Sequence, residues 1–333
     1  MKNKSPLTSV LSLTAIVLLS GCNAKTDLNP TEQGKTALGS LEKCQAYSGL
    51  PQQWLQNKHA GMVRISGGTF QIGSNDHYPE ERSLLKSERK VDDFWIDTTE
   101  VTNAQFRSFV QATDYVTEAE QQGEAAVFTP PTQTADELTW WQLQPNANWK
   151  QPTGPNSKPI AEHEPVRMIT LKDAMAYAKW LGRDLPTEEQ WEYAAKAFSH
   201  QRDVSASSDK DHVNANVWQG EFPYHNDQTD TFAGVAPVGC FAANGFGLYD
   251  MIGNVWEYTQ TPFVGSHDDH MGTEQQLHAH KPQAFNNYTI KGGSYLCADN
   301  YCARYRAAAR HPQESDLAIS HVGFRTVRNA ELH

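Results

Sequence analysis

The sequence predicts a single α+β domain with little regular secondary structure. The chain of 333 residues is rich in tryptophan, tyrosine, glycine and proline, with 9, 12, 22 and 17 copies respectively. This composition favours turns and aromatic packing over long helices and strands. Short segments in which apolar and polar residues alternate indicate strands, and three segments with apolar residues at helical spacing indicate short helices.

The N-terminus predicts export. Lys2 and Lys4 precede an apolar run from Leu7 to Leu19, which is too short to span a bilayer and is followed by Ser20-Gly21-Cys22. A charged start, an apolar centre and small residues before a cleavage point are typical of a signal peptide. We therefore expect residues 1–21 to be a signal peptide.

A cysteine that follows two small residues at this position is the bacterial lipoprotein pattern. In this interpretation the Cys22 thiol carries a diacylglycerol and the new amino end is acylated, so two or more chains anchor the protein to a membrane. Asn23 stands where lipoproteins of the inner membrane usually have Asp. The expected location is therefore the bacterial cell envelope, on the periplasmic face of the outer membrane. The alternative is an ordinary signal peptide with an incidental cysteine.

Charge and length limit the class of protein. Removal of residues 1–21 leaves 333 − 21 = 312 residues and changes the net charge from −11 to −13, because the segment holds two lysines and no acid. So acidic a chain excludes nucleic acid as an expected partner.

A chain of this length can form one large domain or two ordinary ones. We assign residues 22–57 to a lipidated tether with a short helical approach around Leu41 to Leu55, and residues 58–330 to one domain.

The strands are predicted from alternation. Met62 to Gly73 alternates on both sides of Gly67-Gly68, which predicts a hairpin with its turn at the two glycines. Further strands are expected at 91–97, 255–259, 288–291 and 322–327.

The three predicted helices share one start signal. Each begins with a threonine followed three residues later by a side chain that can complete a capping box. The pairs are Thr102 with Gln105, Thr170 with Asp173, and Thr187 with Gln190. Gly182 offers a left-handed end to the second helix.

Four cysteines remain after Cys22. Cys297 and Cys302 are five residues apart and can either hold one soft metal ion together or close as a structural disulfide, which is the usual fate of exported thiols at this spacing. Cys44 and Cys240 either bridge each other or stay apart, with Cys240 partly buried and free. The sequence leaves both choices open at this stage.

Six segments carry a resemblance to a known family. They are residues 62–73, 94–106, 185–193, 216–223, 244–257 and 291–325. In this order they resemble the formylglycine-generating enzyme (sulfatase-modifying factor) family, over about residues 60–329. The resemblance implies the family's fold, a variant of the C-type lectin fold. Many members share the first and last segments without being oxidases, so the resemblance is more specific for fold than for function.

The resemblance implies a copper-dependent oxidoreductase. Cys297 and Cys302 match the two cysteines that hold one Cu(I) in near-linear bis-thiolate coordination in these enzymes, and thiolates are the soft donors that select Cu(I). The implied substrate is an unfolded sulfatase polypeptide with a Cys-X-Pro-X-Arg motif, whose cysteine is converted to formylglycine with dioxygen. Ser294 and Tyr301 match residues that line the oxygen and substrate pocket. The residues around the pair, Gly292-Gly293-Ser294 before it and Arg304, Tyr305, Arg306 and Arg310 after it, favour copper over the disulfide.

The resemblance also implies two structural Ca²⁺ sites, built from side-chain and backbone oxygens as this ion prefers. The first set matches Asn216, the Val217 carbonyl, Asp230 and the Phe232 carbonyl. The second matches Asp250, the Gly253 and Val255 carbonyls and Glu257. Asp250 stands where the animal enzyme has an amide.

Two other functions are compatible with the sequence. One is a non-catalytic, calcium-stabilised, lectin-like envelope lipoprotein with a binding or assembly role. The other is a family member that oxidises a small metabolite, although the iron-dependent relatives carry extra helical domains with histidine ligands that this chain lacks. His267, His270, His278 and His280 resemble metal ligands in composition but not in spacing, and we expect a hydrophilic loop there.

Overall fold

The computed structural model describes residues 1, 38–83, 87–131, 140–197, 214–267 and 286–330. The chain divides into two compact units, Met1–Gln33 and Gly34–His333. Residues 2–37, which hold the signal peptide after Met1, Cys22 and the first part of the tether, lie outside the described residues, so the roles predicted for them stay predictions. Among the described residues, no helix combines the length and the apolar character needed to cross a bilayer.

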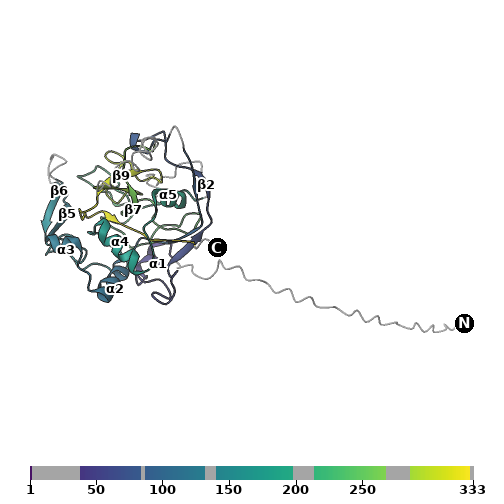
Figure 1. The fold of residues 1–333 in the computed structure, drawn as a ribbon, viewed down its shortest axis with the longest axis horizontal. Coiled ribbons are helices and arrows are strands. Elements are labelled where there is room, and N and C mark those ends of the chain that lie inside the picture. The colour runs from purple at the N-terminus through teal and green to yellow at the C-terminus, as the bar shows by residue number, and fades with distance from the viewer. Residues whose placement is uncertain (2–37, 84–86, 132–139, 198–213, 268–285, 331–333) are drawn as a thin grey trace, which may run out of the picture. The chain divides into compact units, whose positions relative to one another are not determined.

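The second unit contains short strands in small sheets (Figure 1). In the described part of the chain, β10 (Val322–Gly323), β7 (Trp256–Pro262), β8 (Asn287–Lys291) and β9 (Arg310–Glu314) form a four-stranded sheet in that order. A second sheet has the order β1 (Met62–Ile65), β4 (Phe94–Asp97), β11 (Val327–Asn329). Two further pairs are β2 (Gly68–Gln71) with β3 (Glu88–Val91), and β5 (Glu124–Phe128) with β6 (Trp141–Pro145). All these pairs are antiparallel except β10 with β7.

The helices are short and begin where capping side chains satisfy their first amides. They are α1 (Leu41–Gln45), α2 (Asn103–Thr113), α3 (Glu118–Gln122), α4 (Leu171–Trp180) and α5 (Glu188–Lys196), with a 3₁₀ turn η2 at Pro79–Glu81. The capping boxes predicted for α2, α4 and α5 are confirmed. Gly182, after α4, has the left-handed conformation expected of it, with φ +64°. The sequence analysis missed α3, which has the same signal in Thr117 and Glu120.

The hairpin predicted across Gly67 and Gly68 is wrong. The strands on its two sides enter different sheets, because β1 pairs with β4 and β2 pairs with β3. Gly67 lies where the chain crosses another backbone, and a Cβ there would collide with the Val91 carbonyl. Asp93 accepts a hydrogen bond from the Gly67 amide at 2.8 Å. The predicted strand 91–97 is also divided in two, because β3 ends at Val91 and β4 begins at Phe94.

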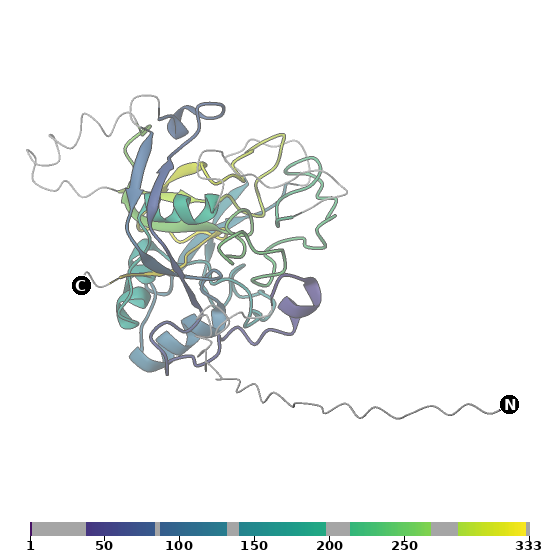
Figure 2. The same cartoon turned by 90° about the vertical axis from the view of Figure 1, so that its right-hand side faces the viewer.

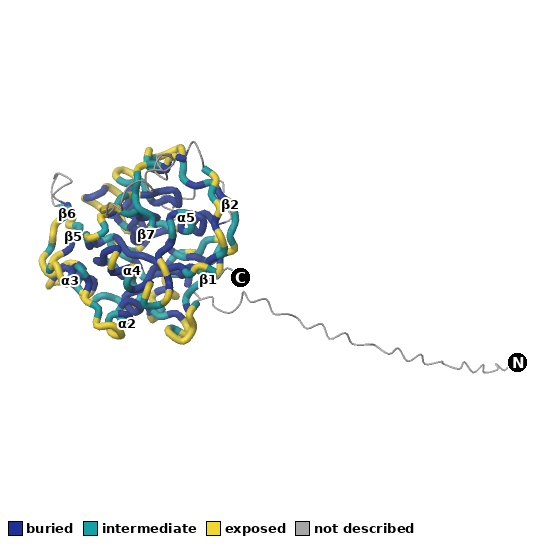
Figure 3. The backbone as a smooth tube through the Cα atoms, viewed as in Figure 1, coloured by how far each residue is buried: buried dark blue, intermediate teal, exposed yellow. Residues whose placement is uncertain are grey.

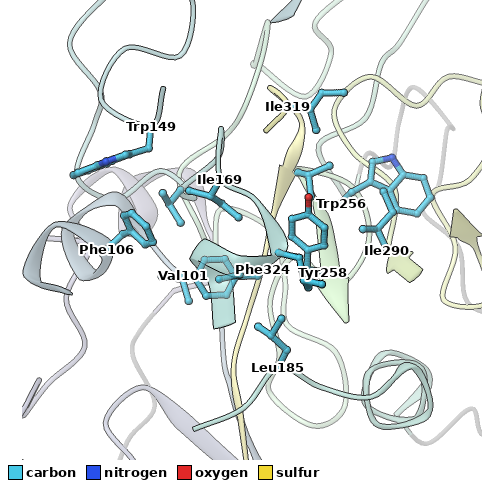
Figure 4. Close-up of a cluster of buried hydrophobic side chains, with 14 of the residues drawn as sticks. Val101, Phe106, Trp149, Ile169, Leu185, Trp256, Tyr258, Ile290, Ile319 and Phe324 are labelled. Atoms are coloured by element: carbon cyan, nitrogen blue, oxygen red, sulfur yellow. The ribbon is translucent and has the colours of Figure 1, made fainter. Parts of the chain in front are cut away.

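Aromatic side chains join the elements into one core cluster (Figure 4). Phe106 on α2 is completely buried, with ring centroids of Trp149 at 5.2 Å, Tyr177 at 5.9 Å and Phe324 at 6.5 Å. Most residues of α5 and the first four residues of β7 are also buried (Figure 3), and α5 packs against β7 and β8. Long loops join these short helices and strands.

Those loops carry the candidate site. The green chain before β7 and the yellow chain between β8 and β9 run through the same part of the domain as loops (Figure 2). The Trp218 amide donates to the Cys297 carbonyl at 2.9 Å and thereby joins the two. The predicted calcium residues and the predicted copper residues are neighbours for this reason.

The aromatic core gives a first prediction. Phe106→Ala should lower the free energy of unfolding by about 3–5 kcal/mol, because it removes a buried ring and leaves a cavity among other rings. Urea unfolding followed by tryptophan fluorescence measures this loss. Val116→Ala, at a side chain that is 52% exposed, is the matched control and should change little. Equal effects of the two substitutions would contradict the assigned core.

Candidate active site

Cys297 and Cys302 lie together in the loop between β8 and β9. Their Sγ atoms are 3.4 Å apart and no disulfide joins them. Cys297 is 2% exposed, whereas Cys302 is partly exposed. Gly293, at φ +77°, allows the two ends of the loop to lie against each other, because a Cβ there would lie 2.6 Å from the Arg304 carbonyl oxygen. The structure therefore brings together the two sulfurs that the sequence singled out.

The loop holds Cys297 from two sides. The Ser294 amide donates to its sulfur at 3.4 Å, and the Cys297 amide donates to the Ser294 carbonyl at 2.9 Å. Ser294 is itself buried, and its hydroxyl accepts a hydrogen bond from the Leu296 amide at 3.3 Å. Ser294 thus lies beside the sulfur pair, where the resemblance puts it, and shapes the tight turn.

The two thiols differ in acidity. Burial raises the pKa of Cys297 well above its usual value, and the neighbouring Cys302 adds to the shift. A hydrogen bond from Cys297 and the nearby Arg304 guanidinium lower the pKa of Cys302 to about 6, against the opposing effect of burial. At neutral pH the pair therefore consists of a buried thiol and a more accessible thiolate, which is the nucleophilic and metal-binding form of cysteine.

Tyr301 lies at the edge of an aromatic cluster beside the cysteines. Its side chain is 41% exposed and stacks on Phe222 at 4.6 Å, while the Trp140 ring lies 5.5 Å away. Leu296 and Trp218 complete the apolar wall. The sequence analysis chose Tyr301 but missed Trp140 and Phe222, since nothing local places them next to residues 297–302.

The first predicted calcium set is assembled around a side-chain amide. Gln219 donates from Nε2 to the Val217 carbonyl and, at 2.9 Å, to Asp230. The other Asp230 oxygen accepts from the Phe232 amide at 2.9 Å. Asn216 is buried and donates to the Gly234 carbonyl at 2.8 Å. Two of the predicted ligand oxygens therefore converge on one point, as ligands of a hard cation must.

The second predicted set contains an excess of buried negative charge. Both oxygens of Glu257 accept hydrogen bonds from Arg325 at 2.7 Å. Asp250 and Glu100 are also buried, and among the described residues Glu100 Oε2 has no hydrogen-bond partner. Burial raises the pKa of Asp250 to about 6, and burial followed by the charges of Asp250 and Glu257 raises that of Glu100. Three buried carboxylates with one arginine are what a divalent cation would neutralise. The donor set fits calcium, and the sequence analysis missed Glu100.

The second set is continuous with the cysteine loop. The Gly253 amide donates to the Gly292 carbonyl at 3.0 Å, and the Tyr295 amide donates to the Asn254 carbonyl at 2.9 Å. Val255, the other predicted backbone ligand, is completely buried.

Comparison with known proteins identifies the family. Residues 47–330 match the model of the sulfatase-modifying factor enzyme 1-like domain. The chain belongs to this sulfatase-modifying factor family. The family resemblance and the α+β fold that it implied are thereby confirmed.

Relatives of this family member have more than one recorded role. A formylglycine-generating enzyme of Mycobacterium tuberculosis is 43% identical over 80% of this chain and 97% of its own. A Bos taurus protein named inactive C-alpha-formylglycine-generating enzyme 2 is 34% identical over 84% of this chain and 93% of its own. The solved structure of PvdO from Pseudomonas aeruginosa, with a TM-score of 0.57 and 22% identity over 81% of this chain and 94% of that chain, shares the fold. Because family membership spans active and inactive proteins, the site must decide the function.

The described residues of this chain contain one further group of potential metal ligands. Glu188, Glu192 and His267 are all buried, and each offers one ligand atom within 4.8 Å of the others. The hydrophilic loop predicted at His267 is wrong for this residue, which is 3% exposed. The other three histidines of that segment lie outside the described residues.

Cations already neutralise these acids. The contacts are Lys196 to Glu192 at 2.8 Å, Lys291 to Glu192 at 2.8 Å, and Arg310 to Glu188 at 2.8 Å. Three positive charges face two carboxylates, so a metal ion would meet net positive charge, although the ligand geometry alone permits it. We interpret the group as a buried ionic network that ties α5 to β8 and β9.

The remaining cysteines are resolved as a disulfide. Cys44 on α1 is joined to Cys240, with the Cα atoms 5.0 Å apart. Of the alternatives left open by the sequence, the structure therefore shows a bridge between Cys44 and Cys240 and free thiols at Cys297 and Cys302.

The buried network predicts acid sensitivity. Burial lowers the pKa of His267 from 6.5 to about 4. Burial would raise the pKa of Glu188, but Arg310 and the neighbouring cations outweigh it and hold that pKa at about 2. The unfolded chain therefore binds more protons between pH 6.5 and 4 at His267 and below about pH 4.5 at Glu188, so the free energy of unfolding falls as the pH falls.

Urea unfolding between pH 7 and 4 tests this dependence. His267→Gln should remove about 3 kcal/mol of the pH-dependent loss between pH 6.5 and 4. His225→Gln, at a side chain that is 73% exposed, is the control and should leave the slope unchanged. An unchanged slope in His267→Gln would show that folding does not lower the pKa of this histidine.

Proposed function

We propose that this protein is a copper-dependent oxidase that converts the cysteine of a Cys-X-Pro-X-Arg motif in an unfolded sulfatase to formylglycine with dioxygen. The observation that carries the proposal is the pair of free thiols of Cys297 and Cys302, with sulfurs 3.4 Å apart on a loop that also carries the exposed Tyr301 ring. The 43% identity to a named formylglycine-generating enzyme over most of both chains supports it.

The donor set suits the proposed ion. Among the described residues, no His, Asp or Glu forms a group of three potential ligands with the two sulfurs. A pair of thiolates favours Cu(I) over harder metals, which prefer oxygen and nitrogen. Bound by Cys297 and Cys302, Cu(I) would supply a soft acceptor for the substrate thiolate and a route for electrons to dioxygen. No organic cofactor is needed.

The protein's own residues would position and shield the reaction. Cys297 lies almost out of contact with water, and the Ser294 amide holds its sulfur at 3.4 Å. Cys302 is partly exposed, so it is the sulfur of the pair that a substrate thiol can reach. Tyr301 is exposed and is held by stacking on the buried Phe222, so its ring offers an aromatic surface beside the pair, against which an extended peptide can pack.

We also propose that Ca²⁺ occupies the two oxygen-lined sets and stiffens the loops that hold the cysteines. The excess of buried carboxylate at Asp250, Glu257 and Glu100 supports the second site. The convergence of Val217 and Asp230 on one point supports the first. Because Gly253 and Gly292 are hydrogen bonded, order in the second set is transmitted to the cysteine loop.

The sequence further supports a lipid anchor at Cys22, and we propose that the enzyme works from the periplasmic face of the outer membrane. Sulfatases exported in an unfolded state would meet it there. Metabolic labelling with a fatty acid, lost in Cys22→Ser, tests the anchor, and membrane fractionation tests the location.

Peptide conversion tests the oxidase. The copper-loaded protein should convert a Cys-X-Pro-X-Arg peptide to its aldehyde under air, as measured by mass spectrometry, and Cys297→Ser or Cys302→Ser should abolish conversion because each removes one of two ligands. A double variant, Cys44→Ser with Cys240→Ser, removes the two cysteines of the disulfide outside the site and should stay active at temperatures where it is folded. Absence of conversion by copper-loaded wild-type protein would favour the non-catalytic scaffold.

Thermal unfolding tests calcium. A free Ca²⁺ concentration one hundred times the Kd should stabilise the protein by about 2.7 kcal/mol per site, and chelation should reverse the effect. Asp250→Ala should lose most of the gain at the second site, whereas the exposed Asp76→Ala should keep it. If neither wild-type protein nor Asp76→Ala responds to Ca²⁺, these sets are hydrogen-bonded loops and not metal sites.

A further inference from the structure

The segment that follows Cys302 is held by a distant turn. Around η2, the consecutive acids Glu80 and Glu81 each bind a different arginine of that segment. Glu80 accepts from Arg304 Nε at 3.0 Å and Nη2 at 2.6 Å, and Glu81 accepts from Arg306 Nη1 at 2.7 Å and Nη2 at 2.6 Å. Two paired contacts with alternate arginines fix the backbone between them, since planar guanidinium groups bind carboxylates in a defined orientation.

Tyr78 adds a third contact to the same segment. Its ring lies 3.8 Å from the Arg304 guanidinium carbon, and its hydroxyl accepts a hydrogen bond from the Ala303 amide at 3.3 Å. Arg304 is therefore held by a carboxylate on its edge and an aromatic ring on its face.

The free edge of Arg304 points to the site. Its Nη1 lies 3.8 Å from the Cys302 sulfur, while the Glu80 contacts use Nε and Nη2. The Arg304 and Glu80 side chains are 18% and 20% exposed, so water screens this contact only in part. The second acidic pair, Glu81 with Arg306, supports the same turn.

We propose that Tyr78 and Glu80 are positioning residues that fix Arg304 as a positive charge beside the Cys302 sulfur, and that this charge strengthens the hold of the cysteine pair on Cu(I). Two thiolates and one Cu(I) carry one net negative charge, which a fixed guanidinium offsets. The part that concerns copper rests on the proposed function. The part that concerns the sulfur does not, because it applies equally to the metal-free thiolate.

Four variants of the full-length chain, purified in detergent, test the assignment. Arg304→Gln removes the charge, Arg304→Lys keeps a charge without the planar fork, and Glu80→Gln releases Arg304 without altering it. Glu120→Gln is the matched control, because Glu120 is 17% exposed and pairs with Lys150 at 2.7 Å on α3. Thermal unfolding of each variant establishes that it is folded.

The first measurement is the Cu(I) affinity, by competition with a coloured chelator. Arg304→Gln and Glu80→Gln should bind Cu(I) about 10–100-fold more weakly, as is typical when a group that supports a metal ligand is lost. Arg304→Lys should recover part of the loss, and Glu120→Gln should match the wild type. Wild-type affinity in both Arg304→Gln and Glu80→Gln would overturn the proposed effect on copper.

The second measurement needs no metal. The rate of iodoacetamide modification of Cys302 at neutral pH, followed by peptide mass spectrometry, should fall several-fold in Arg304→Gln and Glu80→Gln and stay unchanged in Glu120→Gln. Slower modification in a protein that binds no Cu(I) would sink the proposed function and leave the positioning role standing. An unchanged rate in both variants would overturn the positioning role itself.

Discussion

The cysteine loop depends on hydrogen bonds between backbones that belong to no helix or strand. The Trp218 amide binds the Cys297 carbonyl, the Gly253 amide binds the Gly292 carbonyl, and the Tyr295 amide binds the Asn254 carbonyl, at 2.9, 3.0 and 2.9 Å respectively. Buried backbone groups must be paired, and here irregular segments pair with one another. The positions of the two sulfurs are thus coupled to the loops that carry the proposed calcium ligands.

Buried ion pairs hold those loops to the small sheets. Arg325 links Glu257 on β7 to the carbonyls of Asp97 and Tyr249, and Arg310 links Glu188 at the start of α5 to β9. Such pairs cost desolvation energy and are compensated only when every partner is in place. Because each pair needs every partner in place, the loops adopt this arrangement together. Such cooperativity suits a site that must hold two soft ligands at a fixed distance.

Local signals were sufficient for the helices and insufficient for the sheets. Thr102, Thr170 and Thr187 each form a capping box with a residue three positions away, so a segment of four residues is enough to predict where each helix begins. Strand partners are chosen by the whole fold. Gly67 therefore looked like a turn, although it lies where one backbone crosses another, and β1 pairs with β4.

The sequence alone determined the family, the order of its segments and the identity of the two cysteines on which the proposed function rests. Only the tertiary structure decided that Cys297 and Cys302 are free while Cys44 and Cys240 are joined, because thiol pairing depends on distances that residue spacing does not specify. It also brought Glu100 to the second proposed calcium set and Arg304 to the Cys302 sulfur. These contacts join residues far apart in the chain, and the short reach of local side-chain preferences cannot encode them.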